Sequence, residues 1–396
     1  MSAPWRDQPA AGQRDSWSRW WAVLCGVPAL AVVVIVCLGH VWPGPLLLEP
    51  LLAVPPALAG IGARSARTPL IWGGISILTA IAGAVVSPAA TQWLPFATIV
   101  TVAVVTLISA LGAVRSARGS QKLAAVTSVA EAAQRALLRP LPRQVGPLEL
   151  GVVYLAAAAE ARVGGDLYEV ARSPYGIRLI IGDVRGKGLG AVEVAADILG
   201  VFREVAHEVY SLAEVARRLD ASLVRRRAVE DEFVTAVLAE IDPDASRLTI
   251  YNCGHPPPLL LRAGPAEPGA SVPVLGLEVP QPAPPLGLLA LGDSARASCT
   301  VAFKPGDRLL MYTDGVTEAR DAQRRFYPLA ERLADPAVAR PGDPGAQLLD
   351  ALREDLLRHV GAPLTDDAAL LLVGAADVRR GQQRAGVAVA SGQPAG

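Results

Sequence analysis

Residues 163–188 read VGGDLYEVARSPYGIRLIIGDVRGKG, and this stretch decides the fold. Two apolar runs flank residues 173–176, where proline in the second position and glycine in the fourth favour a type I turn. The pattern therefore predicts a β-hairpin. If Ser173 faces Gly176 across this hairpin, Asp166 faces Asp183 on the same side of it.

The facing aspartates suggest a cation site. Directly opposed residues in an antiparallel pair have Cβ atoms about 4.5–5.5 Å apart. Two carboxylates at that distance repel each other unless positive charge lies between them, and a divalent cation is the expected occupant. A slip of the register by two residues keeps both acids on one face, whereas a slip by one separates them. Since type I turns splay two-residue hairpins, the sequence leaves the register open.

The hairpin belongs to a soluble domain that we expect at residues 148–376. Runs typical of strands occupy residues 148–155, 165–171, 177–184, 233–241, 247–252, 257–262, 298–303, 308–313 and 368–373. Helical patterns occupy residues 191–209, 212–226, 329–333 and 346–359. Because strands follow one another as hairpins and helices come in blocks, we predict an α/β fold in which an antiparallel β-sandwich is flanked by helices.

More carboxylates follow or precede apolar strands further along the chain. Asp314 comes directly after the run 308–313, and Asp366 and Asp367 directly precede the run 368–373. One Asp beside a strand is commonly only a turn residue, but several fit a two-metal hydrolytic centre together with Asp166 and Asp183. Oxygen ligands select hard ions such as Mg²⁺ or Mn²⁺. The four scattered cysteines have no zinc-site spacing.

The first part of the chain has the composition of a membrane region. Apolar runs occupy residues 21–40, 45–63, 69–89 and 93–114, and about 20 apolar residues suffice to cross a bilayer as a helix. We therefore predict four transmembrane helices within 21–114, after an N-terminal segment at 1–20. Arginines precede the first run, separate the second from the third and follow the fourth, which predicts cytoplasmic termini in the cell membrane.

A linker is expected at residues 115–147, with an amphipathic helix at 120–138 that the prolines at 140 and 142 end. This helix could be a spacer, could pair with a second copy in a homodimer, or could move relative to the soluble domain. Residues 264–285 and the tail, expected to be disordered over 377–396, have the composition of flexible chain. No strongly basic region points to nucleic acid as a partner.

Several ordered motifs resemble those of the metal-dependent Ser/Thr phosphatases of the PPM family, in the bacterial branch typified by the stage II sporulation protein E phosphatase domain. They are VGGDLYE (163–169), GDVRGKG (182–188), FVTA (233–236), NCGHPP (252–257), YTDGVTEA (312–319) and DDA (366–368). QRALL (134–138) also looks like the family's helix ahead of the domain. The resemblance covers about residues 130–374. It implies the PPM fold, two Mn²⁺ or Mg²⁺ ions and a phosphorylated protein substrate, with an anti-sigma-factor antagonist as the implied partner.

The resemblance also implies roles for individual residues. Asp183 would bridge both ions and Asp166 would contribute from the opposing strand, directly or through water. The remaining implied ligands are the Val184 carbonyl, Asp314, Asp366 and, adjacent to it, Asp367. We expect Asp183, Asp166 and Asp314 to carry catalysis, in which a metal-held water attacks phosphorus without a phosphoenzyme.

Three residues near these motifs have less defined roles. Arg185 stands where the family commonly has a small residue, and it either contacts the substrate phosphate or is simply solvated. His255 is either a proton donor or a structural histidine beside two prolines. Lys187 does not belong to a Walker A loop, because Ile181 and Gly188 occupy positions where that motif requires Gly and Ser or Thr.

Two alternatives compete with the phosphatase. One is a catalytically inactive domain of the same fold that serves as a binding module, which the full set of aspartates disfavours. The other is a membrane diguanylate cyclase, because residues 164–166 match the first part of a Gly-Gly-Asp-Glu-Phe signature. Leu167 and Tyr168 depart from the rest of that signature.

Overall fold

The computed structural model describes residues 27, 30–37, 49–61, 65–86, 94–157, 164–226, 232–263, 271–292 and 297–375. The chain divides into two compact units, Met1–Ala125 and Val126–Gly396.

The first unit is helical where it is described. It contains the 3-10 helix η1 (Glu49–Ala53), α2 (Val54–Gly60), α3 (Arg67–Val86) and the first part of α4 (Leu94–Leu137). Two of its helical segments, Arg67–Val85 and Phe96–Gly119, are long and apolar enough to cross a membrane. They correspond to the third and fourth predicted spans.

The other two predicted spans have less support. The second, at 45–63, contains only η1 and α2 among the described residues. Pro55 and Pro56 lie in the first turn of α2, where the missing amide hydrogens are tolerated, so a short helix begins there. The first, at 21–40, lies largely outside the described residues, with residues 30–37 helical.

The fourth span and the predicted linker helix are one element. Helix α4 runs without interruption for 44 residues, from Leu94 to Leu137. Gly112 and Gly119 each lower helix stability by about 1 kcal/mol but leave the backbone hydrogen bonds intact. The helix ends shortly before Pro140, because a residue that precedes proline disfavours the helical conformation.

The second unit contains two antiparallel sheets. The six-stranded sheet has the order β1 (Gln144–Val145), β2 (Leu148–Leu155), β11 (Ala368–Ala375), β10 (Arg308–Tyr312), β7 (Leu259–Leu261), β8 (Val274–Gly276). The five-stranded sheet has the order β3 (Leu167–Ser173), β4 (Gly176–Val184), β5 (Val234–Ile241), β6 (Arg247–Cys253), β9 (Ser298–Ala302). The predicted strands are confirmed to within about two residues at each end.

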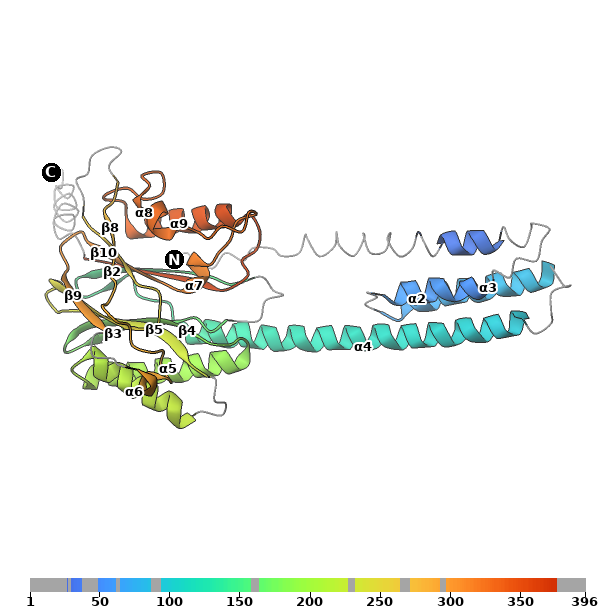
Figure 1. Cartoon of the computed structure of the whole chain (residues 1–396), viewed down its shortest axis with the longest axis horizontal. Coiled ribbons are helices and arrows are strands. Elements are labelled where there is room, and N and C mark those ends of the chain that lie inside the picture. Colours follow the sequence, from blue (N-terminus) through green and yellow to red (C-terminus); the bar gives the residue numbers. More distant parts are fainter. Residues whose placement is uncertain are drawn as a thin grey trace, which may run out of the picture. The chain divides into compact units, whose positions relative to one another are not determined.

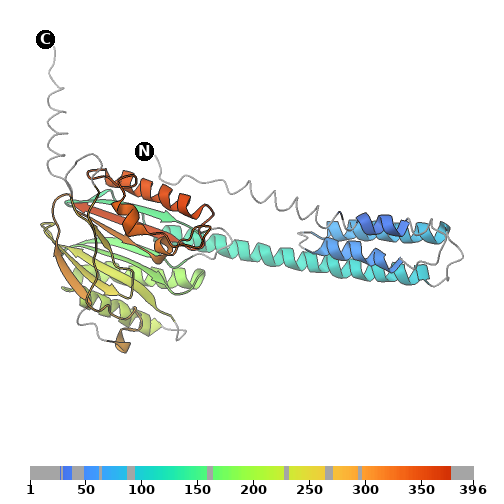
Figure 2. The same ribbon diagram turned by 45° about the horizontal axis from the view of Figure 1, so that its top comes forward.

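Helices cover the outer faces of both sheets. Helices α5 (Leu189–Glu208) and α6 (Leu212–Arg226) pack on the five-stranded sheet, and α9 (Gly345–Val360) packs on β2 and β11 of the other (Figures 1 and 2). Side chains alternate between two cores: Leu309 and Met311 of β10 face the core between the sheets, whereas Leu310 and Tyr312 face the core under α8 (Leu329–Ala334) and α9. The predicted sandwich flanked by helices is therefore confirmed.

One predicted flexible segment is ordered in part. Within residues 264–285, strand β8 pairs with β7, and the side chains of Val272, Leu277 and Ala283 are buried. The prediction of flexible chain is wrong for residues 271–285, because apolar residues between the prolines find a place in the two cores. Residues 264–270 and the predicted tail at 377–396 lie outside the described residues.

Candidate metal centre

The β3–β4 hairpin has the register in which Ser173 faces Gly176. Its ladder runs from this pair to the pair Leu167 and Gly182. The Ser173 hydroxyl accepts a hydrogen bond from the Tyr175 amide at 3.2 Å and donates one to the Gly176 carbonyl at 2.9 Å. Gly176 has φ 130°, a conformation that favours glycine. The register that the turn residues favoured is therefore the one observed, with no slip by one or two residues.

The two aspartates of the hairpin lie directly opposite each other. One step beyond Asp166 and Asp183, the Val184 amide donates to the Gly165 carbonyl at 3.2 Å, so the pairing continues past them. A Cβ atom on Gly165 would lie 2.6 Å from the Val184 carbonyl oxygen, which only glycine avoids. The Val184 carbonyl therefore lies close to the backbone that carries Asp166.

The electrostatics show a group of carboxylates that repel one another. Burial, followed by the charge of Asp183, raises the pKa of Asp166 well above its ordinary value. Burial and then the charges of Asp314 and Asp366 raise the pKa of Asp183 to about 7. Burial is also the first cause that raises the pKa of Asp314. The Thr313 hydroxyl donates to Asp166 at 2.8 Å, and this hydrogen bond partly offsets the rise in the pKa of Asp166.

Neighbouring strands bring the downstream aspartates to the same place. Asp314 begins the short helix α7 (Asp314–Thr317), directly after β10, and β10 pairs with β11. A Cβ atom on Gly315 would lie 1.8 Å from the backbone carbonyl oxygen of Asp367. The absence of a side chain at residue 315 thus lets the start of α7 touch the segment that carries Asp366.

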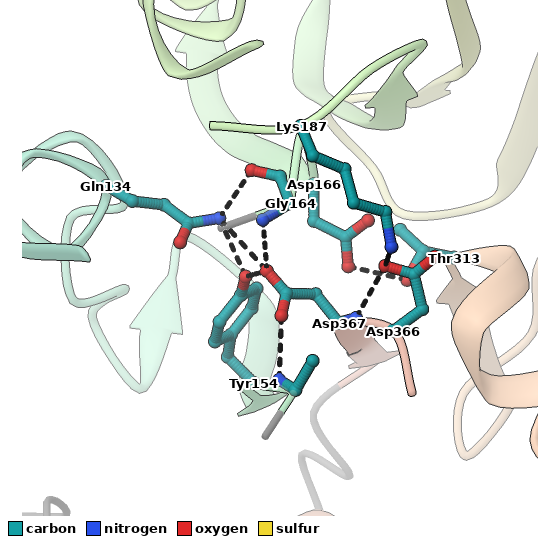
Figure 3. A network of polar contacts seen from close by, with 9 residues as sticks. Gln134, Tyr154, Gly164, Asp166, Lys187, Thr313, Asp366 and Asp367 are labelled. Atoms are coloured by element: carbon teal, nitrogen blue, oxygen red, sulfur yellow. Dashed lines mark hydrogen bonds and ion pairs between the residues drawn. The ribbon is translucent and has the colours of Figure 1, made fainter. Parts of the chain in front are cut away.

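Asp366 and Asp367 face different surroundings (Figure 3). The Asp366 carboxylate is half exposed and pairs with the Lys187 ammonium at 2.9 Å. The Asp367 side chain is buried. It accepts hydrogen bonds from the hydroxyl of Tyr154, the side-chain amide of Gln134 and the backbone amides of Ala157 and Gly164. The Asp366 carboxylate is therefore accessible to an ion, whereas the oxygens of the Asp367 carboxylate are already used in hydrogen bonds within the protein.

The donor chemistry of this group fits a hard divalent ion. The candidate ligands are carboxylates and one carbonyl, and oxygen donors of this kind suit Mg²⁺ and Mn²⁺. A cation among them would offset the repulsion that raises their pKa values. Within the described ranges, no three Asp, Glu, His or Cys side chains already form a finished binding arrangement. The candidate ligands therefore fit a divalent ion by donor type and location. Two of them also contact other side chains: Asp166 accepts from Thr313, and Asp366 pairs with Lys187.

His255 has a structural role. Its Nε2 lies 3.0 Å from the Tyr312 carbonyl oxygen, so this nitrogen carries the hydrogen and donates. Its Nδ1 lies 3.0 Å from the Thr235 hydroxyl and accepts from it. Burial lowers the pKa of His255 to about 4, which keeps the ring neutral. Because both ring nitrogens form hydrogen bonds within the protein, the structure favours a structural histidine rather than a proton donor.

Arg185 lies on the turn after β4. Its amide donates to the Phe233 carbonyl at 3.0 Å, and its guanidinium lies over the Phe233 ring, 5.1 Å from the centroid. The side chain is exposed beside the strand that carries Asp183. The guanidinium is therefore placed by the Phe233 ring on the turn that directly follows β4.

Three residues of the site were not found from the sequence. Thr313 directly precedes Asp314 in the quoted motif, and a hydroxyl beside a candidate ligand could have been considered. Gln134 and Tyr154 contact Asp367 across 233 and 213 positions of the chain. No local pattern signals contacts over such separations.

Comparison with known proteins assigns the domain. A family model described as stage II sporulation protein E matches residues 173–375, just over half of the chain. The chain belongs to this family. The matched domain is a phosphatase domain of the PP2C, or PPM, type, a class of metal-dependent hydrolases. The diguanylate cyclase alternative is thereby overturned, and the predicted enzyme class is confirmed.

Two solved structures and a curated relative are similar to parts of the chain. The SiaA-PP2C domain of Pseudomonas aeruginosa is 18% identical with a TM-score of 0.50, covering 66% of this chain and 98% of that one. The RsbU and RsbW domains of Rv1364c from Mycobacterium tuberculosis are 26% identical with a TM-score of 0.47, covering 59% and 61%. Protein IcfG from Synechocystis is 23% identical over 242 residues, covering 53% of this chain and 36% of that protein. The chain thus spans just over a third of this curated relative.

Proposed function

We propose that the phosphatase domain holds two Mn²⁺ or Mg²⁺ ions with Asp166, Asp183, Asp314, Asp366 and the Val184 carbonyl, and hydrolyses phosphoserine or phosphothreonine in a partner protein. The observation that carries this proposal is the directly opposed pair Asp166 and Asp183, with Asp314 and Asp366 close enough to raise the pKa of Asp183. Carboxylates gathered in this way repel one another and need a cation.

The chain's own residues divide the work. Asp183 faces Asp166 across the hairpin and is close enough to Asp314 and Asp366 for their charges to raise its pKa, so it is the residue that would bridge two ions. Thr313 orients the Asp166 carboxylate through its 2.8 Å hydrogen bond. The ions, when bound, lower the pKa of a coordinated water and offset charge on the phosphoryl oxygens. Arg185 presents its guanidinium beside β4, where it binds two oxygens of the substrate phosphate.

Of the two adjacent acids, we assign the ligand role to Asp366 rather than Asp367. Asp366 has one salt-bridge partner, Lys187, and half of its side chain is exposed. Asp367 already accepts from four donors, about as many as the lone pairs of a carboxylate allow. Asp367 therefore contributes to the site by holding the backbone of Ala157 and Gly164 in place.

The proposal includes a membrane anchor. The apolar helices Arg67–Val85 and Phe96–Gly119 support it, and the distribution of arginines favours a multi-pass protein of the cell membrane with a cytoplasmic phosphatase domain. Spans at 21–40 and 45–63, contact with the lipid bilayer through all four, and pairing of two copies through residues 115–147 remain predictions. A phosphorylated anti-sigma-factor antagonist is the substrate that the family favours.

Two assays test the proposal. The full-length chain, purified in mild detergent, is expected to hydrolyse a phosphoserine or phosphothreonine peptide with Mn²⁺ and to lose that activity in excess EDTA. Equal turnover with and without EDTA contradicts the metal-dependent mechanism, and no turnover under either condition supports the inactive binding module. For the anchor, the chain is expected to stay in the membrane pellet after alkaline carbonate washing, and release into the wash contradicts it.

A further inference from the structure

The buried carboxylate of Asp367 is the centre of a polar network that reaches helix α4 (Figure 3). Asp367 and Gln134 are 5% and 6% exposed, so their hydrogen bonds are shielded from water. The Tyr154 hydroxyl, on β2, donates to Asp367 Oδ2 over a short distance. Hydrogen bonds to a charged, buried acceptor are stronger than those between neutral groups.

Gln134 completes this network from the last turns of α4. Its Nε2 lies 2.7 Å from the Tyr154 hydroxyl oxygen, 3.2 Å from the Gly164 carbonyl oxygen and 3.4 Å from Asp367 Oδ2. Because the Tyr154 proton goes to Asp367, the oxygen of Tyr154 is free to accept from Gln134. All three neighbours are therefore acceptors, and the NH₂ group of the amide is the end that fits among them.

The network fixes the backbone at both sides of the metal centre. The Gly164 amide donates to Asp367 Oδ2 at 3.0 Å, and its carbonyl accepts from Gln134, so both polar groups of this residue are held. A Cβ atom on Gly164 would lie 2.7 Å from the same carboxylate oxygen, which shows how closely the two segments approach. Gly164 lies two residues before Asp166, and Asp367 follows Asp366 directly.

We infer that Gln134 is a positioning residue of the metal centre: it ties the C-terminal turns of α4 to the two backbone segments that carry Asp166 and Asp366, and thereby raises the affinity for divalent ions. The inference rests on the proposed function. Gln134 touches neither ion nor substrate, so it acts only through Gly164, Tyr154 and Asp367. The end of α4 is then part of the metal centre rather than a spacer ahead of it.

The test measures metal affinity directly. Mn²⁺ binding to the full-length chain in detergent is followed by electron paramagnetic resonance of the free ion, with melting curves recorded in EDTA. Gln134→Met removes the donor at similar volume, and Tyr154→Phe removes only the hydroxyl. Each is expected to weaken Mn²⁺ binding about tenfold, the change that 1.4 kcal/mol produces. Because both act through the same carboxylate, the double variant should lose less than the product of the two single losses.

A matched control lies next to Gln134 on the same helix. The Arg135 side chain is exposed and pairs with Glu131 one turn away, so Arg135→Ala should leave Mn²⁺ affinity unchanged. Variants that melt at lower temperature but bind Mn²⁺ within twofold of the parent overturn the inference, because that is the result of a packing role alone. If Gln134→Met does not fold, Tyr154→Phe decides by the same criterion. A parent chain that binds no Mn²⁺ overturns the proposed function as well, whereas unchanged variants overturn the inference alone.

Discussion

The carboxylates of Asp166 and Asp183 face each other at the open end of the β3–β4 hairpin, between the pair Leu167–Gly182 and the hydrogen bond from Val184 to Gly165. Both are acids whose pKa is raised, and Asp183 reaches about 7. A folded protein tolerates such a pair at the expense of stability, so the arrangement makes physical sense when a cation is bound.

Removing the Asp183 charge should lower the activity of the protein but raise its stability in the absence of metal. We expect Asp183→Asn to lower Mn²⁺-dependent hydrolysis roughly 10³-fold, because several kcal/mol of metal-supplied charge stabilisation is lost. In EDTA the same variant should melt at a higher temperature than the parent, since it lacks a repelled buried charge. As a control, Asp350→Asn changes an exposed carboxylate on α9 and should leave both properties unchanged. Undiminished turnover in Asp183→Asn would refute its role as the bridge.

The stability gain should depend on pH. Because the folded-state pKa of Asp183 is about 7 and its ordinary value is 3.8, the folded protein binds this proton more tightly between about pH 4 and 7. The charge therefore destabilises the parent increasingly as pH rises through this window. In EDTA the melting-temperature gap between Asp183→Asn and the parent should widen from pH 4.5 to 7.5. The opposite trend from His255, whose pKa is lowered to about 4, is common to both proteins and cancels. A gap that stays constant contradicts the assignment.

Gly315 is expected to be essential for its lack of a side chain. A Cβ atom there would overlap the Asp367 carbonyl at 1.8 Å, so Gly315→Ala should push α7 away from the segment of Asp366 and weaken Mn²⁺ binding at least tenfold. Gly200→Ala is the matched control, because a Cβ atom at this position of α5 meets nothing within 4 Å. There, alanine should stabilise the helix by about 0.5–1 kcal/mol. Equal Mn²⁺ affinity in the two variants would show that the close approach does not shape the site.

A buried arginine clamp should dominate the stability of the five-stranded sheet. The Arg178 guanidinium is fully buried, pairs with Glu240 at 2.6 Å and donates to the carbonyls of Ala206, Val209 and Tyr210 at the end of α5. Arg178→Met should lower the free energy of unfolding by about 3–5 kcal/mol, because it leaves Glu240 and these carbonyls unpaired.

Denaturant unfolding of the EDTA-treated chain measures this effect. The exposed neighbour Arg172 on β3 provides the control, and Arg172→Met should change stability by less than about 0.5 kcal/mol. A loss below 1 kcal/mol in Arg178→Met would show that the clamp is dispensable.

The strands around the candidate site were largely predictable, because the sequence patterns that specify them are local. The turn residues 173–176 favoured the observed hairpin register without excluding a slip, and that register places Asp166 opposite Asp183. A continuous apolar run likewise defines β10, because both faces of this strand meet a core. Asp314 was predictable because it follows this strand directly.

Other features depend on contacts that no local pattern carries. The order of strands in the sheets and the network of Gln134, Tyr154 and Asp367 arise from residues far apart in the chain. The different surroundings of Asp366 and Asp367 could not be read from two identical adjacent letters. The continuity of α4 was missed because the polar residues 115–122 suggested a break, although they have adequate helix propensity.

The most direct test of the metal centre is anomalous diffraction from crystals of the protein grown with Mn²⁺. We predict two anomalous peaks, with the Asp183 carboxylate in contact with both and with Asp166, Asp314 and Asp366 around them. Anomalous density elsewhere, or none among these four residues in a protein that still hydrolyses phosphopeptide, would contradict the account.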